Sequence, residues 1–508
     1  MRLMIESRFD IIYKSNLRHN LSLRSILLLN QQKILDMKVQ QIYTNCLAHG
    51  AYYIESDGEA AIIDPLRETQ QYLDMAEERG AKIKYIFETH FHADFVSGHI
   101  DLSKKTGAPI IYGPTTMTTG FDITVGEDGQ VFNLGNVTIK LLHTPGHTTE
   151  SSSFLLIDEN NKQQALFSGD TLFIGDVGRP DLAQKVIAEL TQDKLARMLY
   201  SSLREKIMPL DDDVIVYPGH GAGSACGKNM SKETTDTLGN QKKTNYALQP
   251  MSEDEFVAQV LDGLTPPPAY FPHNVLMNIN GYESLDAVLE DGLKPLSVSE
   301  FETIAEETNA VIVDTRSEVD FVKGFIPNSI FIGVDGSFAT WVGTILKDVT
   351  TPIVFVADEG REEEVAVRMA RIGFDNTLGY LKGGISSWQN AGKRLETIKT
   401  FNAKDLAFEH QNQRTNILDV RKESEYNSQH LEEAMNAPLD YYEDQLAKLD
   451  KEKTYHVHCA GGYRSVIFIS LLQSKGYTNL INVAGGFEAI QENGTIKTTE
   501  YVCPTTLL

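Results

Sequence analysis

The chain has 508 residues, enough for about three domains, and its 41% hydrophobic and 23% charged residues are typical of a globular protein. A net charge of -24 repels phosphate and anionic lipid, so we expect no nucleic acid and no membrane as partners and favour a small-molecule substrate. The four cysteines are too few and too scattered for a disulfide scaffold, and no apolar run is long enough to span a bilayer. These features predict a cytoplasmic protein.

Residues 1–36 are mildly basic and lack the small-residue cleavage site of a secretory signal, while Glu6 and Asp10 argue against a transit peptide. We interpret them as a dispensable extension that precedes Met37. A short helix packed on the first domain is the alternative.

From Lys38 onward, apolar runs alternate with helix-like segments. We predict strands at Ala60–Ile63, Ile83–Glu88, Pro109–Tyr112 and Val137–Leu142, and helices at Thr69–Glu78 and Gly98–Lys105. Interleaved strands and helices, with polar turns at strand ends, indicate a layered α/β sandwich whose functional site lies along one edge.

Histidines and aspartates gather in those turns. The stretch Thr89-His-Phe-His-Ala-Asp-Phe-Val-Ser-Gly-His99 follows one strand, and His147, Asp170 and His220 stand in later Gly-containing turns. Imidazoles at positions i and i+2 of an irregular turn can face one cavity, so the pattern predicts a transition metal bound by histidine and aspartate. The motifs in this order resemble the metallo-β-lactamase superfamily, which implies an αββα sandwich over residues 37–228.

Hydrolytic members of that superfamily usually hold two metals and use a His-x-His-x-Asp-His motif, but the last position of the motif is Phe95 here. A phenyl ring cannot coordinate, so a second ion would keep only Asp94, His220 and a shared Asp170. We therefore predict one metal.

Two imidazoles and one carboxylate on one face leave open positions opposite them, as in non-haem iron(II) oxygenases. The pattern resembles the persulfide dioxygenases, which implies one Fe(II) per chain bound by His90, His147 and Asp170. The same resemblance puts His92, Asp94 and His220 around these ligands, where they hold water or orient the ligands. Coordination by His92 stays open.

Two further residues belong to this predicted site. Arg179 stands in a Gly-Arg-x-Asp turn and either holds the ligand loops or an anionic sulfur substrate, or forms a structural salt bridge with Asp181. Cys226 lies just past His220 in a Gly-containing turn and either carries sulfur, pairs with a substrate thiol, or is a bystander.

Residues 229–295 contain the run Thr265-Pro-Pro-Pro-Ala-Tyr-Phe-Pro272. Prolines in series cannot continue a helix or an interior strand, so we predict an extended segment laid over the first domain. Part of this segment could close the substrate site.

An internal repeat follows. Val311-Ile-Val-Asp-Thr-Arg316 returns as Ile417-Leu-Asp-Val-Arg421, and Leu381-Lys-Gly-Gly-Ile385 returns as Val483-Ala-Gly-Gly-Phe487. Each copy starts with a predicted helix, Ser297–Glu307 or Asn402–His410, before a strand that ends in Asp-x-Arg. The copies resemble rhodanese domains, which implies parallel α/β domains at residues 296–396 and 397–495 and a tail at 496–508.

The last copy carries the loop Cys459-Ala460-Gly461-Gly462-Tyr463-Arg464-Ser465 between a predicted strand, Tyr455–His458, and a predicted helix, Val466–Lys475. Backbone N–H groups, the helix N-terminus and Arg464 would favour the thiolate and stabilise its persulfide. A cysteine phosphatase has one residue more between cysteine and arginine, so the spacing favours sulfur transfer, with Cys459 and Arg464 as catalytic residues. Asp419 and Arg421 are predicted to stabilise the fold.

The middle copy has no cysteine, because none occurs between Cys226 and Cys459. Its corresponding loop, Val356-Ala-Asp-Glu-Gly-Arg-Glu-Glu-Glu364, carries carboxylates that repel anions. We predict an inactive rhodanese that serves as a spacer or docking surface.

Together the parts resemble the multidomain persulfide dioxygenase–rhodanese fusions of bacterial sulfide detoxification. The resemblance implies that a low-molecular-weight thiol persulfide is oxidised with O2 to sulfite, and that Cys459 passes sulfane sulfur to sulfite to give thiosulfate. We also expect a homo-oligomer. The alternatives are a dinuclear zinc thioester hydrolase similar to glyoxalase II and a non-catalytic sulfur carrier or sensor.

Overall fold

The structure is a computed structural model that describes residues 37–182, 191–264, 266–412 and 415–503. The expected extension at residues 1–36 lies outside the described residues. The chain forms two compact units, the first from Met1–Thr44, Ala48–Phe91 and Gly98–Leu261 and the second from Asn45–Leu47, His92–Ser97 and Asp262–Leu508. Within the described ranges, no helix has both the length and the apolar character that crossing a bilayer requires.

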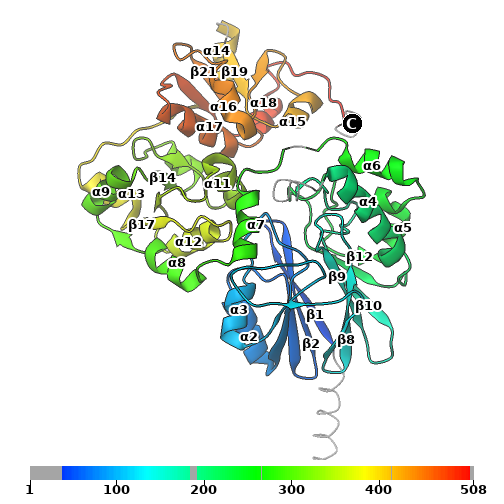
Figure 1. The fold of residues 1–508 in the computed structure, drawn as a ribbon. Helices are drawn as coiled ribbons and strands as arrows, with labels where there is room; N and C mark the ends of the chain where they lie inside the picture. Colours follow the sequence, from blue (N-terminus) through cyan, green and yellow to red (C-terminus); the bar gives the residue numbers. More distant parts are fainter. Residues whose placement is uncertain (1–36, 183–190, 265, 413–414, 504–508) are drawn as a thin grey trace, which may run out of the picture. The chain divides into compact units, whose positions relative to one another are not determined.

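Two six-stranded sheets form the first unit (Figure 1). The first sheet runs in chain order: β1 (Lys38–Thr44), β2 (His49–Ser56), β3 (Glu59–Ile63), β4 (Lys82–Phe87), β5 (Ile110–Tyr112) and β6 (Thr124–Val125). The second has the order β12-β11-β10-β9-β8-β7: β7 (Val131–Leu134), β8 (Val137–His143), β9 (Ser152–Ile157), β10 (Gln163–Gly169), β11 (Ile215–Pro218) and β12 (Asp236–Thr237). The four strands and two helices predicted here are confirmed to within one residue at each end.

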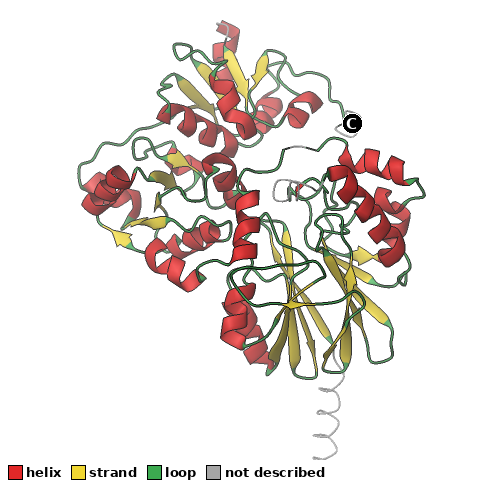
Figure 2. Cartoon of the chain, viewed as in Figure 1, coloured by secondary structure: helices red, strands yellow, loops and turns green. Residues whose placement is uncertain are grey.

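Alternating side chains let the two sheets pack face to face. Their shared core includes Tyr52 and Phe87 from the first sheet and Phe154 and Phe167 from the second. Helices α2 (Gln70–Arg79) and α3 (His99–Thr106) cover the outer face of the first sheet. Helix α4 (Gln192–Ser202) and the π-helix η2 (Leu203–Ile207) cover that of the second. These four layers are the predicted αββα sandwich (Figure 2).

The prediction of an extended segment at residues 229–295 is wrong, because much of it is helical. Helix α5 (Leu238–Thr244), the 3-10 turn η3 (Tyr246–Leu248) and α6 (Glu253–Leu261) pack into the first unit, which ends at Leu261 rather than at residue 228. Helices α7 (Phe271–Asn280) and α8 (Leu285–Gly292) belong to the second unit. Pro272 stands in the first turn of α7, where a proline fits because its missing N–H would have no partner in the helix.

The predicted repeat forms two five-stranded parallel sheets in the second unit, with strand orders β13-β17-β16-β14-β15 and β18-β22-β21-β19-β20. The middle copy consists of β13 (Pro295–Leu296), α9 (Val298–Thr308), β14 (Val311–Asp314), α10 (Glu318–Phe321), β15 (Ile330–Phe331), α11 (Phe338–Leu346), β16 (Ile353–Val356), α12 (Glu362–Ala370), β17 (Thr377–Leu381) and α13 (Gly384–Asn390). The last copy consists of β18 (Lys399–Phe401), α14 (Ala403–Asn412), β19 (Asn416–Asp419), α15 (Glu423–Ser428), β20 (Ala434–Asn436), η4 (Leu439–Tyr441), α16 (Tyr442–Leu446), β21 (Tyr455–His458), α17 (Tyr463–Ser474), β22 (Leu480–Val483) and α18 (Gly486–Asn493). Both copies therefore share one topology.

The boundaries of the copies differ from the prediction. Helix α8 packs against Ala370 of α12, so the middle copy starts before residue 296. At the other end, Ile496 joins the core of the last copy, and Thr499 N donates to the His430 carbonyl oxygen at 2.8 Å. Residues 496–503 thus belong to the last domain rather than to a separate tail, while residues 504–508 lie outside the described ranges.

Each copy has a buried ion pair at the end of the strand that carries the Asp-x-Arg motif, β14 or β19. Arg421 Nη2 donates to Asp419 Oδ2 at 2.6 Å and to the Gln429 carbonyl oxygen at 2.8 Å. The middle copy repeats these contacts between Arg316 and Asp314, at 2.6 Å. Because removing one partner of a buried pair costs about 3–5 kcal/mol, these pairs hold the turn after the strand, in agreement with the structural role predicted for Asp419 and Arg421.

Candidate metal centre and sulfur-transfer loop

Three side chains from three strand ends converge in the first unit. His90 lies beyond β4, His147 beyond β8, and Asp170 directly after β10. His147 Nε2 lies 3.4 Å and His90 Nε2 3.9 Å from Asp170 Oδ2, and all three residues are buried. One ligand atom from each lies within 4.8 Å of the other two. The structure thus brings together the three residues predicted as metal ligands.

Hydrogen bonds at the far side of each imidazole orient the ring. His147 Nδ1 lies 2.8 Å from the carbonyl oxygen of Arg179, which can only accept, so this nitrogen carries the proton. His90 Nδ1 lies 3.0 Å from Thr89 Oγ1, whose own proton goes to Asp64 Oδ2 at 2.8 Å, so this Nδ1 is also the donor. In this tautomer Nε2 is the nitrogen of each ring that can bind a metal, as in metal-binding histidines.

Sequence reasoning missed Asp64 and Thr89, which support His90 in this way. A signal was present, since Asp64 directly follows the predicted strand Ala60–Ile63, as other site residues follow theirs.

The surroundings of Asp170 fit a cation. Both carboxylate oxygens are buried and make no hydrogen bond to any described residue. A buried charge in that situation costs several kcal/mol unless an opposite charge compensates it. Ligand atoms bound at about 2.1 Å from one ion lie roughly 3–3.5 Å apart, near the distances between the Nε2 atoms and Asp170. Gly219 leaves room for this group, because a Cβ at that position would lie 2.5 Å from Asp170 Oδ1.

A second group of possible ligands lies at the other oxygen of Asp170. His220 Nε2 is 3.6 Å from Asp170 Oδ1, and His92, Asp94 and His220 each offer a ligand atom within 4.8 Å of the others. Phe95 is fully buried and its ring packs on His92, with centroids 4.3 Å apart. The phenyl ring supplies no ligand atom. The group is nevertheless richer than the predicted set of Asp94, His220 and Asp170, because His92 joins it.

Arg179 borders the metal centre through its backbone. Its carbonyl oxygen orients His147, and its N–H donates to the Cys226 carbonyl oxygen at 3.0 Å. The guanidinium makes two hydrogen bonds to Asp181, both 2.7 Å long. Arg179 therefore makes the structural salt bridge and also ties the loops around His147, two of the predicted roles.

Cys226 is 1% exposed and lies near the metal centre. Its sulfur is within 4.8 Å of ligand atoms of Asp170 and His220. The thiol is therefore near enough to Asp170 and His220 to share a ligand with them.

The second candidate site is the loop between β21 and α17. Cys459 is 1% exposed, its Sγ accepts a hydrogen bond from Gly462 N at 3.1 Å, and it lies 3.9 Å from Ser465 Oγ. Gly462 has a φ of 116°, which a residue with a Cβ rarely adopts, and this conformation belongs to the turn that directs its N–H to the sulfur. Helix α17 begins at Tyr463, three residues earlier than predicted, so the positive end of its dipole lies at the loop.

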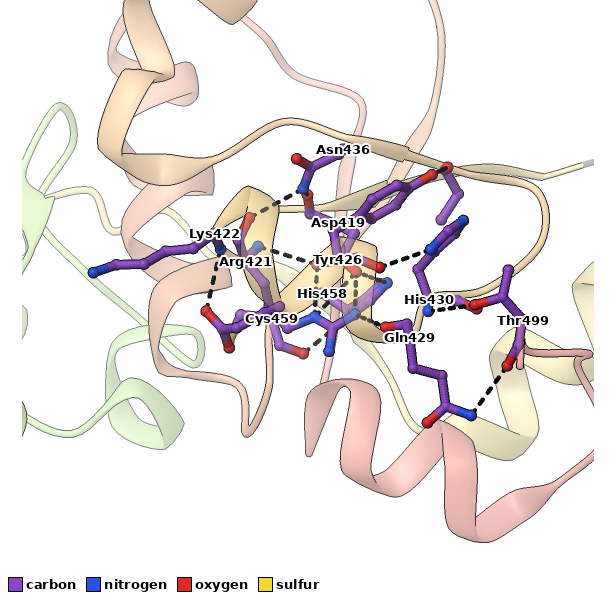
Figure 3. A network of polar contacts seen from close by, with 12 residues as sticks. Asp419, Arg421, Lys422, Tyr426, Gln429, His430, Asn436, His458, Cys459 and Thr499 are labelled. Carbon is purple, nitrogen blue, oxygen red and sulfur yellow. Dashed lines mark hydrogen bonds and ion pairs between the residues drawn. The ribbon is translucent and has the colours of Figure 1, made fainter. Parts of the chain in front are cut away.

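Polar side chains of neighbouring strands gather beside Cys459 (Figure 3). His458 Nδ1 lies 3.2 Å from the Cys459 carbonyl oxygen, and His458 Nε2 lies 3.9 Å from Asp419 Oδ2. Burial lowers the pKa of His458, and the nearby Asp419 carboxylate only partly opposes this effect. The ring is therefore neutral at pH 7.

Arg464 is paired with a residue that sequence reasoning missed. Its guanidinium donates to both carboxylate oxygens of Glu425, at 2.6 and 2.8 Å. Burial would raise the pKa of Glu425, but the hydrogen bonds and charge of Arg464 outweigh burial and bring it below its usual value. The charged carboxylate offsets part of the positive potential predicted at Cys459, so the Gly462 N–H is the direct partner of the sulfur.

Tyr463 and the middle copy are in contact. The Tyr463 hydroxyl donates to the Gly333 carbonyl oxygen at 2.7 Å, and its ring packs against Phe331 with centroids 5.4 Å apart. In the middle copy, Ala357 stands where the last copy has Cys459, because Val356 pairs with Asp314 as His458 pairs with Asp419. The middle copy therefore has no thiol at this position.

Comparisons with known proteins agree with this architecture. Residues 45–220 match the metallo-beta-lactamase superfamily, and residues 297–391 and 402–493 match the rhodanese-like domain. A crystal structure of a metallo-beta-lactamase from Staphylococcus aureus is 31% identical, with a TM-score of 0.59, and covers 68% of this chain and 98% of its own.

Similar curated proteins carry different activities in their names. The mitochondrial persulfide dioxygenase ETHE1 of Mus musculus is 30% identical over 211 residues, which are 41% of this chain and 73% of the mouse protein. A hydroxyacylglutathione hydrolase, GloC, of Haemophilus influenzae is 29% identical over 195 residues, 34% of this chain and 85% of its own. A beta-lactamase hydrolase-like protein of Xylella fastidiosa is 27% identical over 293 residues, 51% of this chain, and the chain spans only 64% of it.

The chain belongs to the metallo-β-lactamase superfamily and carries two rhodanese-like domains after its sandwich. This fold binds metal, and the arrangement is that of an enzyme. The dioxygenase and the hydrolase are similar to this chain at nearly equal identity, so identity alone does not separate their activities.

Proposed function

We propose that the protein is a non-haem iron persulfide dioxygenase and sulfurtransferase that acts in sulfide detoxification. The observation that carries the proposal is the set His90, His147 and Asp170, two imidazoles and one carboxylate without a hydrogen bond among the described residues, in a chain whose metal motif has Phe95 in place of its last histidine. Such a set leaves positions open on one side of an Fe(II) ion. When bound there, Fe(II) would supply the redox chemistry that couples O2 to sulfur.

The chain's own residues orient and shield that centre. Thr89 and the Arg179 carbonyl fix the two rings, and all three ligand residues are buried. The overall reaction consumes one persulfide, one O2 and one water, and it releases the thiol, sulfite and two protons. Cys226 is close enough to the ligands to contact the sulfur end of a substrate.

Sulfur transfer would use Cys459. Its thiolate attacks the outer sulfur of a second persulfide, the S–S bond breaks, and the thiolate of the small thiol leaves. Sulfite then attacks the outer sulfur on Cys459, which gives thiosulfate and returns the thiolate. The Gly462 N–H stabilises the sulfur charge in both steps.

The test uses the full chain with Cys459→Ser and, as a matched control, the exposed Cys503→Ser. With glutathione, coenzyme A or bacillithiol persulfide, we expect both variants to take up O2 as the parent does. Cys459→Ser should release sulfite in place of thiosulfate, while the control keeps thiosulfate. Unchanged thiosulfate from Cys459→Ser would refute the role of this residue. No O2 uptake, together with stable labelling of Cys459 by persulfide, would point to a sulfur carrier instead.

A dinuclear zinc thioester hydrolase is the second candidate. The observation that favours it is the group His92, Asp94 and His220 at the other oxygen of Asp170, a position from which Asp170 could bridge two ions. Two zinc ions per chain with thioester hydrolysis in the absence of O2 would establish it. One iron per chain with persulfide-dependent O2 uptake would exclude it. The cytoplasmic location and homo-oligomeric state remain predictions.

A further inference from the structure

The second half of the metal motif, His92–Ser97, packs in the second compact unit together with α7 and the middle rhodanese-like copy. It has no regular secondary structure, so its buried peptide groups need partners outside the segment. Asn278 of α7 forms three hydrogen bonds with these peptide groups. Its Nδ2 donates to the carbonyl oxygens of His92, at 2.8 Å, and Phe95, at 2.9 Å, and its Oδ1 accepts from Ser97 N at 3.0 Å.

Other residues of the same unit complete this support. Tyr282 OH donates to the Ser97 carbonyl oxygen, and Val96 N donates at 2.7 Å to the carbonyl oxygen of Arg371, at the end of α12. Helix α7 also lies tightly against that turn, because a Cβ at Gly373 would be 2.7 Å from Asn274 Oδ1. A continuous set of contacts therefore leads from the middle copy to the segment that carries two possible ligands, His92 and Asp94.

Asn278 itself is fully buried, and one planar amide makes all three of these hydrogen bonds. Its removal would leave two carbonyl groups and one N–H buried without their present partner. Each such loss costs about 1–3 kcal/mol in a rigid site, so a flexible segment would shift instead to find water. His92 and Asp94 would then no longer be held in their present positions.

We propose that Asn278 is a positioning residue for the metal motif, and that the cysteine-free middle copy holds the motif in place through α7 and Arg371. This role goes beyond the spacer or docking surface predicted for that copy. It does not depend on whether the centre uses O2 or hydrolyses thioesters.

The test compares Asn278→Ala with Asn274→Ala in the full chain. Asn274 is an equally buried amide one turn earlier on α7, and its side chain has no hydrogen bond among the described residues. We expect metal-free Asn278→Ala to bind Co(II) about 10- to 100-fold more weakly than the parent, with altered d–d absorption bands. Asn274→Ala should stay within about threefold of the parent and keep its spectrum.

Folding is checked independently. Both tryptophans, Trp341 and Trp388, lie in the middle copy, so their fluorescence reports whether it remains folded. Hydrogen exchange of the metal-free protein should show faster exchange at residues 92–97 in Asn278→Ala alone. Equal Co(II) affinity and spectra in both variants and the parent would overturn the proposal, as would equal weakening by both substitutions. Neither result involves persulfide or O2, so it leaves the proposed reaction untouched.

Discussion

Replacing Asp170 by Asn removes a negative charge from a position that is 2% exposed and where neither oxygen receives a hydrogen bond from a described residue. In the metal-free protein, an unpartnered buried ion costs several kcal/mol, whereas an unpartnered amide costs about 1–3 kcal/mol. We therefore expect metal-free Asp170→Asn to be about 1–3 kcal/mol more stable than the metal-free parent. For a domain of this size the Tm should rise by about 2–12 °C.

With metal bound, the difference in stability should change sign, so that Asp170→Asn is less stable than the parent. At a metal concentration 1,000 times Kd, binding stabilises the parent by about 4 kcal/mol, and the variant loses most of this gain. Differential scanning calorimetry at pH 8, with chelator and with added Co(II), measures both effects, and elemental analysis gives metal per chain. Asp122 is exposed, so Asp122→Asn serves as a control that should change neither the Tm nor the amount of metal per chain. A Tm shift of the same sign in both states, or full metal occupancy in Asp170→Asn, would contradict the assignment.

Two further predictions use other residues. Phe95→His should add an imidazole beside His92 and raise zinc from one to two ions per chain by elemental analysis, whereas Phe95→Tyr should leave one ion; two ions in the parent would contradict the reasoning. A further prediction concerns acid stability. Burial holds the pKa of His458 below the ordinary 6.5, so as the pH falls the unfolded chain binds a proton at this residue before the folded chain does. The free energy of unfolding of the last copy should therefore fall as pH drops below about 6.5. His458→Asn should reduce this dependence on pH, measured by hydrogen exchange. An equal dependence on pH in the variant and the parent would refute the role of His458.

The sequence was most informative where chemistry and periodicity coincide. Strands of the sandwich were predicted to within one residue, because short alternating runs end in polar turns. Three of those turns carry His90, His147 and Asp170, and strand ends on one edge of a sandwich meet in space. The Asp-x-Arg repeat could be predicted for the same reason, since it directly follows matching strands in both copies.

Other features depend on contacts that leave no local pattern. The prolines before and within α7 indicated a break in structure, yet a proline in the first helical turn is compatible with a helix. Nothing local shows that Asn278, nearly two hundred positions after the metal motif, binds that motif. The pairing of Arg464 with Glu425 likewise joins two separate helices, α15 and α17. Such partners are selected by the assembled fold.

The contacts of Tyr463 with the middle copy bear on how sulfur would reach Cys459 in the proposed reaction. If the last copy were to swing on its linker, it would break the bond to the Gly333 carbonyl and uncover the ring beside Phe331, at a cost of about 2–4 kcal/mol. These contacts therefore favour the arrangement in which the two rhodanese-like copies stay in contact. If Cys459 carries sulfur as proposed and keeps this arrangement, a small carrier has to bring the sulfur by diffusion, so the rate of loading should rise in proportion to the concentration of that carrier.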